Sequence, residues 1–91
     1  MAKTTIKLFT TLGGKLVKDA GEIEAADVAQ VLEQLAAKHG ENFRKEIYSG
    51  GVVKNYYIVL HNGAFVDREH PDEALLADGD TVHIFPPVSG G

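Results

Sequence analysis

The sequence of 91 residues contains no cysteine, which excludes disulfides, iron–sulfur clusters and a thiol nucleophile belonging to this chain. It also has no apolar run of membrane-spanning length, and the residues after Met1 do not form the apolar centre of a signal peptide. We therefore expect a cytoplasmic protein with no membrane partner. The formal net charge of −4 argues against nucleic acid as a main partner.

The sequence also lacks the usual motifs of metal and catalytic sites. Its four histidines are scattered, and none has the His-x-x-x-His spacing of a zinc site. Asp78-Gly79-Asp80 lacks the other ligands of a calcium loop. Gly13-Gly14 and Gly50-Gly51 are not followed by the Lys-Ser/Thr of a phosphate loop, and no serine carries a nucleophile motif. We expect no metal site, no bound cofactor and no internal catalytic centre.

The chain is expected to form a single domain, since 91 residues leave no room for a second core. Its N-terminal third predicts a β-hairpin. Residues 4–12 alternate in polarity and are rich in β-formers, which predicts a strand with Ile6 and Leu8 toward the core. Gly13-Gly14 then marks a loop. A weaker second strand within residues 16–23 would complete the hairpin.

Residues 27–40 have the pattern of an amphipathic helix. Asp27 is suited to the N-cap, and Gln30 stands at the third helical position, as in a capping box. Gly40 provides a C-terminal stop. Five apolar residues at helical spacing form one stripe that we expect to be buried: Val28, Val31, Leu32, Leu35 and Ala36.

The second half of the chain predicts further strands. Residues 41–55 are polar and are expected to form a loop, whereas residues 56–61 predict a strand that ends at the hairpin signal Asn62-Gly63. Ala77-Asp78-Gly79-Asp80 predicts a tight turn before a last strand at residues 81–85. The order ββαβ(β)β predicts an α+β fold, a β-grasp or ubiquitin-like roll. Its mixed sheet would carry one main helix on one face and hold the first and last strands parallel at its centre.

The last strand is followed by two prolines and then by small residues. Proline fixes φ and cannot donate to a sheet ladder, so Pro86-Pro87 should end the strand and direct the chain outward. Residues 1–85 are therefore the predicted domain, and residues 86–91 are a predicted extended tail. Gly90-Gly91 has no side chain to obstruct a narrow channel, which would suit delivery of a carboxylate at Gly91 to a partner's active site.

A second candidate site is an aromatic patch on the outer face of the sheet. If Ile84 points toward the core, Phe85 points outward, and by the same parity Phe9 is outward on the neighbouring strand. Phe65 could join them from the hairpin. These three phenylalanines predict a partner-docking patch beside the root of the tail. The alternative is that a loop covers some of them or that they belong to the core.

Together these segments resemble the MoaD/ThiS sulfur-carrier family, and most closely the small subunit of molybdopterin synthase. The resemblance rests on the Asp78-Gly79-Asp80 turn and on the ending Phe85-Pro86-Pro87-Val88-Ser89-Gly90-Gly91 one strand later. It extends to the N-terminal Ile-Lys-Leu-Phe strand, the helix and Asn62-Gly63, and so spans nearly the whole chain. Residues 41–55 and 68–75 are longer than in minimal members. This leaves open a relative that serves another pathway, for thiamine or a tungsten cofactor.

The resemblance implies a mechanism in which the chain is not catalytic alone. An E1-like adenylating enzyme would use ATP to activate the Gly91 carboxylate, and a sulfur donor protein would displace AMP to leave a thiocarboxylate. The tail would thread into the molybdopterin synthase large subunit, where the sulfur is transferred to the cyclic pterin precursor. The threading residues would be Pro86, Pro87, Val88, Ser89 and Gly90. The alternative from another class is a ubiquitin-like modifier conjugated to lysines of other proteins.

Overall fold

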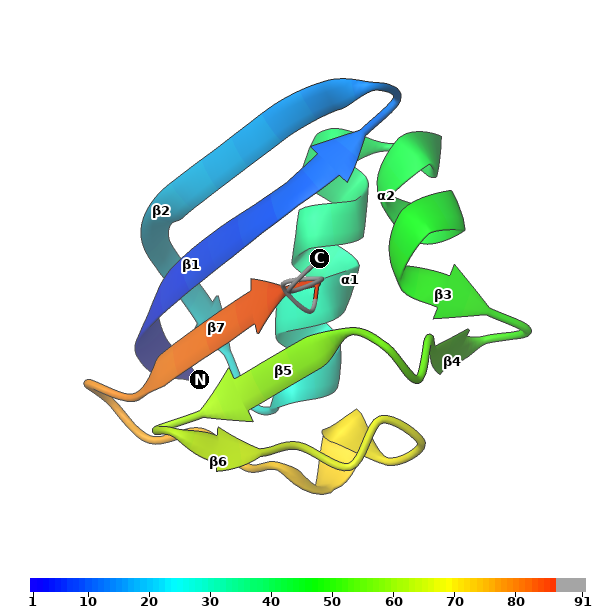
Figure 1. Cartoon of the computed structure of the whole chain (residues 1–91). Helices are drawn as coiled ribbons and strands as arrows, with labels where there is room; N and C mark the ends of the chain where they lie inside the picture. The colour runs from blue at the N-terminus through cyan, green and yellow to red at the C-terminus, as the bar shows by residue number, and fades with distance from the viewer. Residues whose placement is uncertain (87–91) are drawn as a thin grey trace.

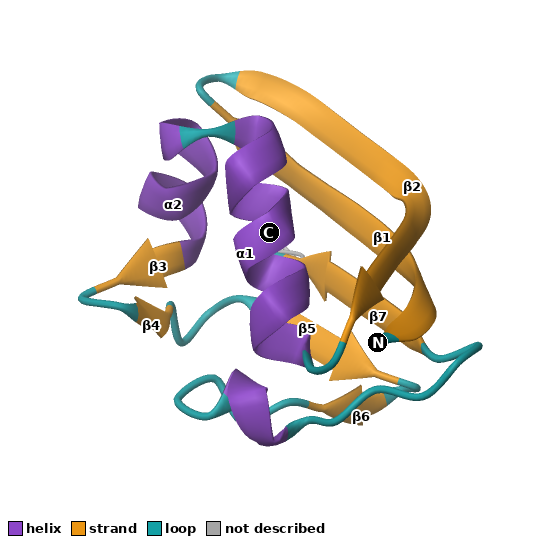
Figure 2. Cartoon of the chain, turned by 180° about the vertical axis from the view of Figure 1, so that it is seen from behind, coloured by secondary structure: helices purple, strands orange, loops and turns teal. Residues whose placement is uncertain are grey.

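One mixed sheet forms the centre of the molecule, and helix α1 packs across one face of it (Figures 1 and 2). The computed structural model describes residues 1–86. The sheet has the strand order β2-β1-β7-β5-β6. Its strands are β1 (Ala2–Leu12), β2 (Lys15–Ala25), β5 (Ile58–His61), β6 (Ala64–Phe65) and β7 (Thr81–Phe85). The other elements are α1 (Val28–His39), α2 (Glu41–Ile47), the ribbon of β3 (Tyr48–Ser49) and β4 (Val52–Val53), and the 3-10 turn η1 (Pro71–Glu73).

The N-terminal hairpin confirms the alternation predicted from the sequence. Gly13 and Gly14 have φ values of 58° and 79°, so both occupy the left-handed region that a type I′ hairpin turn requires. β1 alternates between buried and exposed residues along its whole length. Ile6 and Leu8 are buried, as predicted, while Phe9 is exposed on the opposite face.

Helix α1 also forms as its sequence signals predict. The Asp27 side chain accepts a hydrogen bond from the Gln30 backbone at 2.9 Å, and the Gln30 side chain accepts one from Ala26 at 2.8 Å. These two bonds satisfy backbone groups that the first helical turn leaves unpaired. Gly40 ends the helix with a φ of 81°. All five residues of the predicted stripe are buried, which confirms the face of α1 that packs on the sheet.

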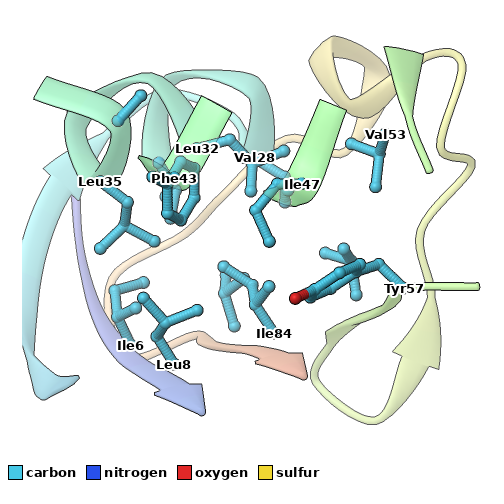
Figure 3. Packing of buried hydrophobic residues seen from close by; sticks show 14 of the residues in the cluster. Ile6, Leu8, Val28, Leu32, Leu35, Phe43, Ile47, Val53, Tyr57 and Ile84 are labelled. Atoms are coloured by element: carbon cyan, nitrogen blue, oxygen red, sulfur yellow. The ribbon is translucent and has the colours of Figure 1, made fainter. Parts of the chain in front are cut away.

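The prediction of a loop over residues 41–55 is wrong, because this segment contains α2 and the β3–β4 ribbon. Phe43 and Ile47 are fully buried and lie four residues apart, which places both on one face of a helix. They join the layer of α1 side chains above the sheet (Figure 3). The remaining residues of α2 are polar and, apart from the half-buried Glu46, exposed, so the segment is polar in composition but amphipathic in arrangement.

The predicted central pairing of the first and last strands is confirmed. β1 and β7 are parallel, with pairs from Thr5–Thr81 to Leu8–Ile84. β5 is shorter than its prediction because Tyr57 lies before the strand. Its hydroxyl contacts Thr10 and donates to Glu46 at 2.8 Å. Burial raises the pKa of Tyr57 far above its usual range, so this phenol stays protonated.

Asp80 fixes the start of β7, the strand that leads to the predicted tail. Its carboxylate accepts from the Ala77 backbone at 2.9 Å and lies 2.7 Å from His61 Nε2. Contacts with Asn62 and His61 lower the pKa of Asp80 from 3.8 to about 2. The turn at Asn62-Gly63 has φ values of 50° and 82°, which confirms the predicted hairpin.

We predict that Asp80→Asn lowers the free energy of unfolding in a pH-dependent manner. A carboxyl group with a lowered folded-state pKa stabilises the fold fully above its unfolded value of 3.8, and this contribution disappears as the pH falls toward about 2. Urea unfolding across this range should show the two proteins converging at the acidic end. A stability difference that does not change with pH would contradict the assignment to ionised Asp80.

Candidate functional site

The face of the sheet opposite α1 is the candidate site. No helix of the described residues covers it, because α1 and α2 both lie on the other side (Figures 1 and 2). Strand register builds one row of side chains across this face, with Lys7 opposite His83, His83 opposite Leu60, and Leu60 opposite Phe65. The residue types in this row change from a cation at β1 to apolar groups at β5 and β6.

The next row contains two of the three predicted phenylalanines. Phe9 follows Lys7 by two residues on β1, and Phe85 follows His83 by two residues on β7, so both side chains point to the open face. Because β1 and β7 are parallel neighbours, the two rings lie in adjacent positions. Phe85 is also paired with Ile58 of β5, which continues the row with another apolar side chain.

The β1 and β7 members of these rows, together with residues of β2, line a shallow groove of 630 Å³ at the C-terminal end of β7. Phe9 and Phe85 give it an apolar floor, and Pro86 forms part of its wall. Lys7 and Lys18 supply positive charge, with Lys18 Nζ 5.6 Å from the centre of the Phe9 ring. The groove can therefore take an apolar group of a partner whose margin carries acidic residues.

The structure separates Phe65 from this groove. Phe65 is 80% exposed on β6, two strands away from β7, and borders a different hollow of 220 Å³ with His70 and Glu73. Phe9 is 45% exposed, which excludes the alternative that it belongs to the core. The segment of residues 41–55 packs beside α1 and does not cover the open face (Figure 2).

The described part of the predicted tail consists of Pro86 alone, which is half-buried directly after β7. Five predicted site residues lie outside the described residues: Pro87, Val88, Ser89, Gly90 and Gly91. The root of the tail therefore adjoins the groove.

The period of two along each strand predicts that Lys7 lies on the same face as Phe9, and His83 on the same face as Phe85, as the structure shows. The sequence-based set of site residues nevertheless omitted Lys7, His83 and Lys18, which line the groove. Lys18 could be placed only through the hairpin register, in which it lies opposite Phe9. The position of Lys18 is therefore signalled by pairing between strands and not by any local motif.

His39 and His61 each contact a carboxylate. Residues 1–86 contain no group of three or more His, Asp or Glu side chains that could hold a metal ion. His39 Nε2 lies 2.8 Å from Asp19, which also receives Lys38 Nζ at 2.9 Å. The hydrogen bond from Lys38, assisted by His39, lowers the pKa of Asp19. No helix in this part of the chain is long and apolar enough to span a membrane.

Comparison with known proteins adds to this geometry. The sequence matches the ThiS family over residues 6–91. It is 38% identical to small archaeal modifier protein 3 of Haloferax volcanii over 66 residues, which cover 72% of this chain and 71% of that protein.

Two solved structures share the fold over nearly the full length. Small archaeal modifier protein 1 of Haloferax volcanii has a TM-score of 0.70 at 26% identity and covers 99% of this chain and 100% of its own. A Pyrococcus furiosus protein assigned as molybdopterin converting factor, subunit 1, has a TM-score of 0.67 at 30% identity, with 97% and 100% covered. The chain therefore belongs to the ThiS family, which comprises sulfur carriers and ubiquitin-like small modifiers.

Proposed function

We propose that this chain is the sulfur carrier of a molybdopterin synthase and that the carboxylate of Gly91 carries the sulfur. The observation that carries this proposal is the position of the Phe85–Gly91 sequence, which continues directly from the strand that forms the groove. A partner bound at the groove would lie next to Pro86, where residues 87–91 are attached. The 30% identity to a molybdopterin converting factor subunit supports this pathway.

The proposed chemistry occurs on the chain but is performed by its partners. A carboxylate at neutral pH does not react with sulfur nucleophiles, so an E1-like enzyme first transfers AMP from ATP to Gly91 and releases pyrophosphate. The terminal sulfur of a persulfide on a sulfur donor protein then attacks the acyl carbon and displaces AMP, and a thiol cleaves the resulting acyl disulfide to release the thiocarboxylate. Residues 88–91 could span about 13 Å when extended, which is sufficient to reach a buried centre of the large synthase subunit. The consumption of ATP is consistent with the predicted cytoplasmic location.

We predict that Phe9→Ala weakens binding to the E1-like enzyme encoded in the same genome by about 30-fold. Truncation of a central aromatic side chain in a docking site costs about 2 kcal/mol. Phe65→Ala is the matched control, because it removes the same side chain from the open face outside the groove. Isothermal titration calorimetry would measure both affinities. Equal weakening by the two substitutions would contradict docking at the groove.

A second candidate is a ubiquitin-like modifier conjugated to lysines of other proteins, and the 38% identity to small archaeal modifier protein 3 favours it. Both functions begin with adenylation and differ in what attacks the activated carbonyl. Intact-mass analysis of this chain, after incubation with the E1-like enzyme, ATP and a sulfur donor, would test the choice. Replacement of one oxygen by sulfur supports the carrier, whereas isopeptide remnants on lysines of other proteins support the modifier.

The pathway served by the carrier requires a separate test. Thiamine and tungsten-cofactor synthesis are the alternatives to molybdopterin. The thiocarboxylated chain should convert the cyclic pterin precursor when it is combined with a large synthase subunit. Conversion only with the acceptors of thiazole synthesis would assign the chain to the thiamine pathway.

A further inference from the structure

Strand β2 forms the outer edge of the sheet. It is eleven residues long and pairs with β1 on one side, and neither view of the molecule shows a segment of the described chain beyond it (Figures 1 and 2). The opposite edge strand, β6, has only two residues. A long edge strand presents unpaired backbone groups and is a template for pairing with another strand.

The hydrogen bond of Gln34 identifies which backbone groups of β2 point outward. Gln34 Nε2 donates to the Glu24 carbonyl at 2.7 Å, so the Glu24 backbone faces away from β1. Backbone direction alternates along a strand of an antiparallel ladder, so the residues at even positions face the same way. They are Leu16, Lys18, Ala20 and Glu22. Among the described residues, no hydrogen bond from a turn, loop or cap reaches these four backbones.

We propose that the occupant of this edge is a second copy of the chain, whose β2 pairs antiparallel with β2 about a two-fold axis at Ala20. Ala20 is the middle residue of Lys15–Ala25, so this register aligns the two strands along their length. The paired ladder is centred on residues 18–22, because the Glu24 carbonyl already accepts a hydrogen bond from Gln34. This register places outward-facing backbones opposite one another, as an antiparallel ladder requires. The central pairs on the open face are Ala20 with Ala20 and Lys18 with Glu22 of the second copy, and Leu16 lies opposite Glu24 farther from the axis.

Charge complementarity favours a second copy as the partner, in a register that pairs Lys18 with a glutamate. Lys18 meets Glu22 twice, once on each side of the axis, and opposite charges at directly paired positions stabilise a sheet. Moving the axis to residue 19 would set two Asp19 carboxylates against each other. Moving it to residue 21 would set Asp19 against the apolar side chain of Ile23. That register would also pair Lys18 with Glu24, but the outward carbonyl of Glu24 already accepts a hydrogen bond from Gln34.

The side chains on the inner face fit the same register. Val17 lies opposite Ile23 of the second copy, and both are half-buried residues packed against their own core. Asp19 lies opposite Gly21, which leaves space for the ion pairs that Asp19 makes with α1. A groove of 280 Å³ between β2 and α1 borders Gly21 and Ile23, where the second copy's Val17 would lie.

The dimer would have a consequence for the open face. A two-fold axis perpendicular to the sheet joins the two sheets edge to edge, so both open faces point to the same side. The two docking grooves, and the two Pro86 residues beside them, would therefore be presented together. This inference is independent of the proposed function, because the edge of β2 is defined without reference to the tail.

Cross-linking of Ala20→Cys tests the register, and the chain contains no other cysteine. Residues opposite each other in a hydrogen-bonded antiparallel pair have Cα atoms about 5.5 Å apart, within the range of a disulfide. Lys18→Cys and Glu22→Cys are matched controls, because each cysteine would lie about 13 Å along the strand from the same cysteine of the second copy. Under mild oxidation we expect a covalent dimer from Ala20→Cys alone. Cross-linking of Lys18→Cys as readily as Ala20→Cys, or no covalent dimer from Ala20→Cys, would overturn the proposal.

A charge exchange tests the contact without a covalent bond. In sedimentation equilibrium of the whole chain, we expect Lys18→Glu to raise the dissociation constant of the dimer by about tenfold, since two attractive pairs become repulsive. The double substitution Lys18→Glu with Glu22→Lys should restore the affinity, because the two charges are exchanged within the same pair. A double variant as weak as Lys18→Glu, or a wild-type chain that stays monomeric at every concentration, would refute the dimer.

Discussion

Replacing Gly91 with alanine is expected to reduce sulfur transfer by at least about 100-fold while the fold remains intact. A misplacement of a reacting group by about 1 Å can cost a factor of this size, and under the proposed mechanism a methyl group at Gly91 would obstruct a narrow channel in the partner's active site. Single-turnover transfer from the thiocarboxylated chain to the cyclic pterin precursor would measure the effect. Urea unfolding of the same sample should show an unchanged free energy.

Gly21→Ala is a suitable control for this experiment. Gly21 lies in β2, and a methyl group added there would meet no atom within 4 Å. It should therefore fold and transfer sulfur at the wild-type rate. Deletion of Gly90 and Gly91 should abolish transfer but preserve binding to the E1-like enzyme, because the groove is built from residues 7–86. Wild-type transfer by Gly91→Ala would count heavily against the proposed role of Gly91.

Phe43→Ala is expected to have the largest effect on stability. Phe43 is fully buried among the α1 side chains (Figure 3), and truncation of a buried phenylalanine costs about 3–5 kcal/mol. A domain of this length has a total stability of roughly 5–14 kcal/mol, so the variant would lose a large share of it. Equilibrium unfolding in urea would measure the difference.

Phe65→Ala provides the comparison, because Phe65 is 80% exposed and its removal leaves no cavity. Its effect should stay within about 0.5 kcal/mol. Equal destabilisation by the two substitutions would show that α2 does not contribute to the core as its burial indicates. The pair also distinguishes a structural phenylalanine from one available to partners.

Local sequence signals were sufficient to predict the elements whose defining residues lie close together along the chain. The cap at Asp27, the apolar stripe of α1 and the stop at Gly40 are contacts within one helix, so they could be predicted without knowledge of the fold. The turns at Gly13-Gly14 and Asn62-Gly63 are equally local, because each requires φ values that its own residues readily adopt. The Gly-Gly ending was likewise visible in the sequence alone.

Which of these elements contact one another depends on the three-dimensional packing of the chain. The polar composition of residues 41–55 concealed α2, because just two apolar residues, Phe43 and Ile47, anchor it and their burial depends on α1. The groove joins Phe9 to Phe85 and leaves Phe65 apart, although all three were expected in one patch. Pairing between distant strands sets these neighbours. Local sequence can indicate which way a side chain points, but only the strand order determines what lies beside it.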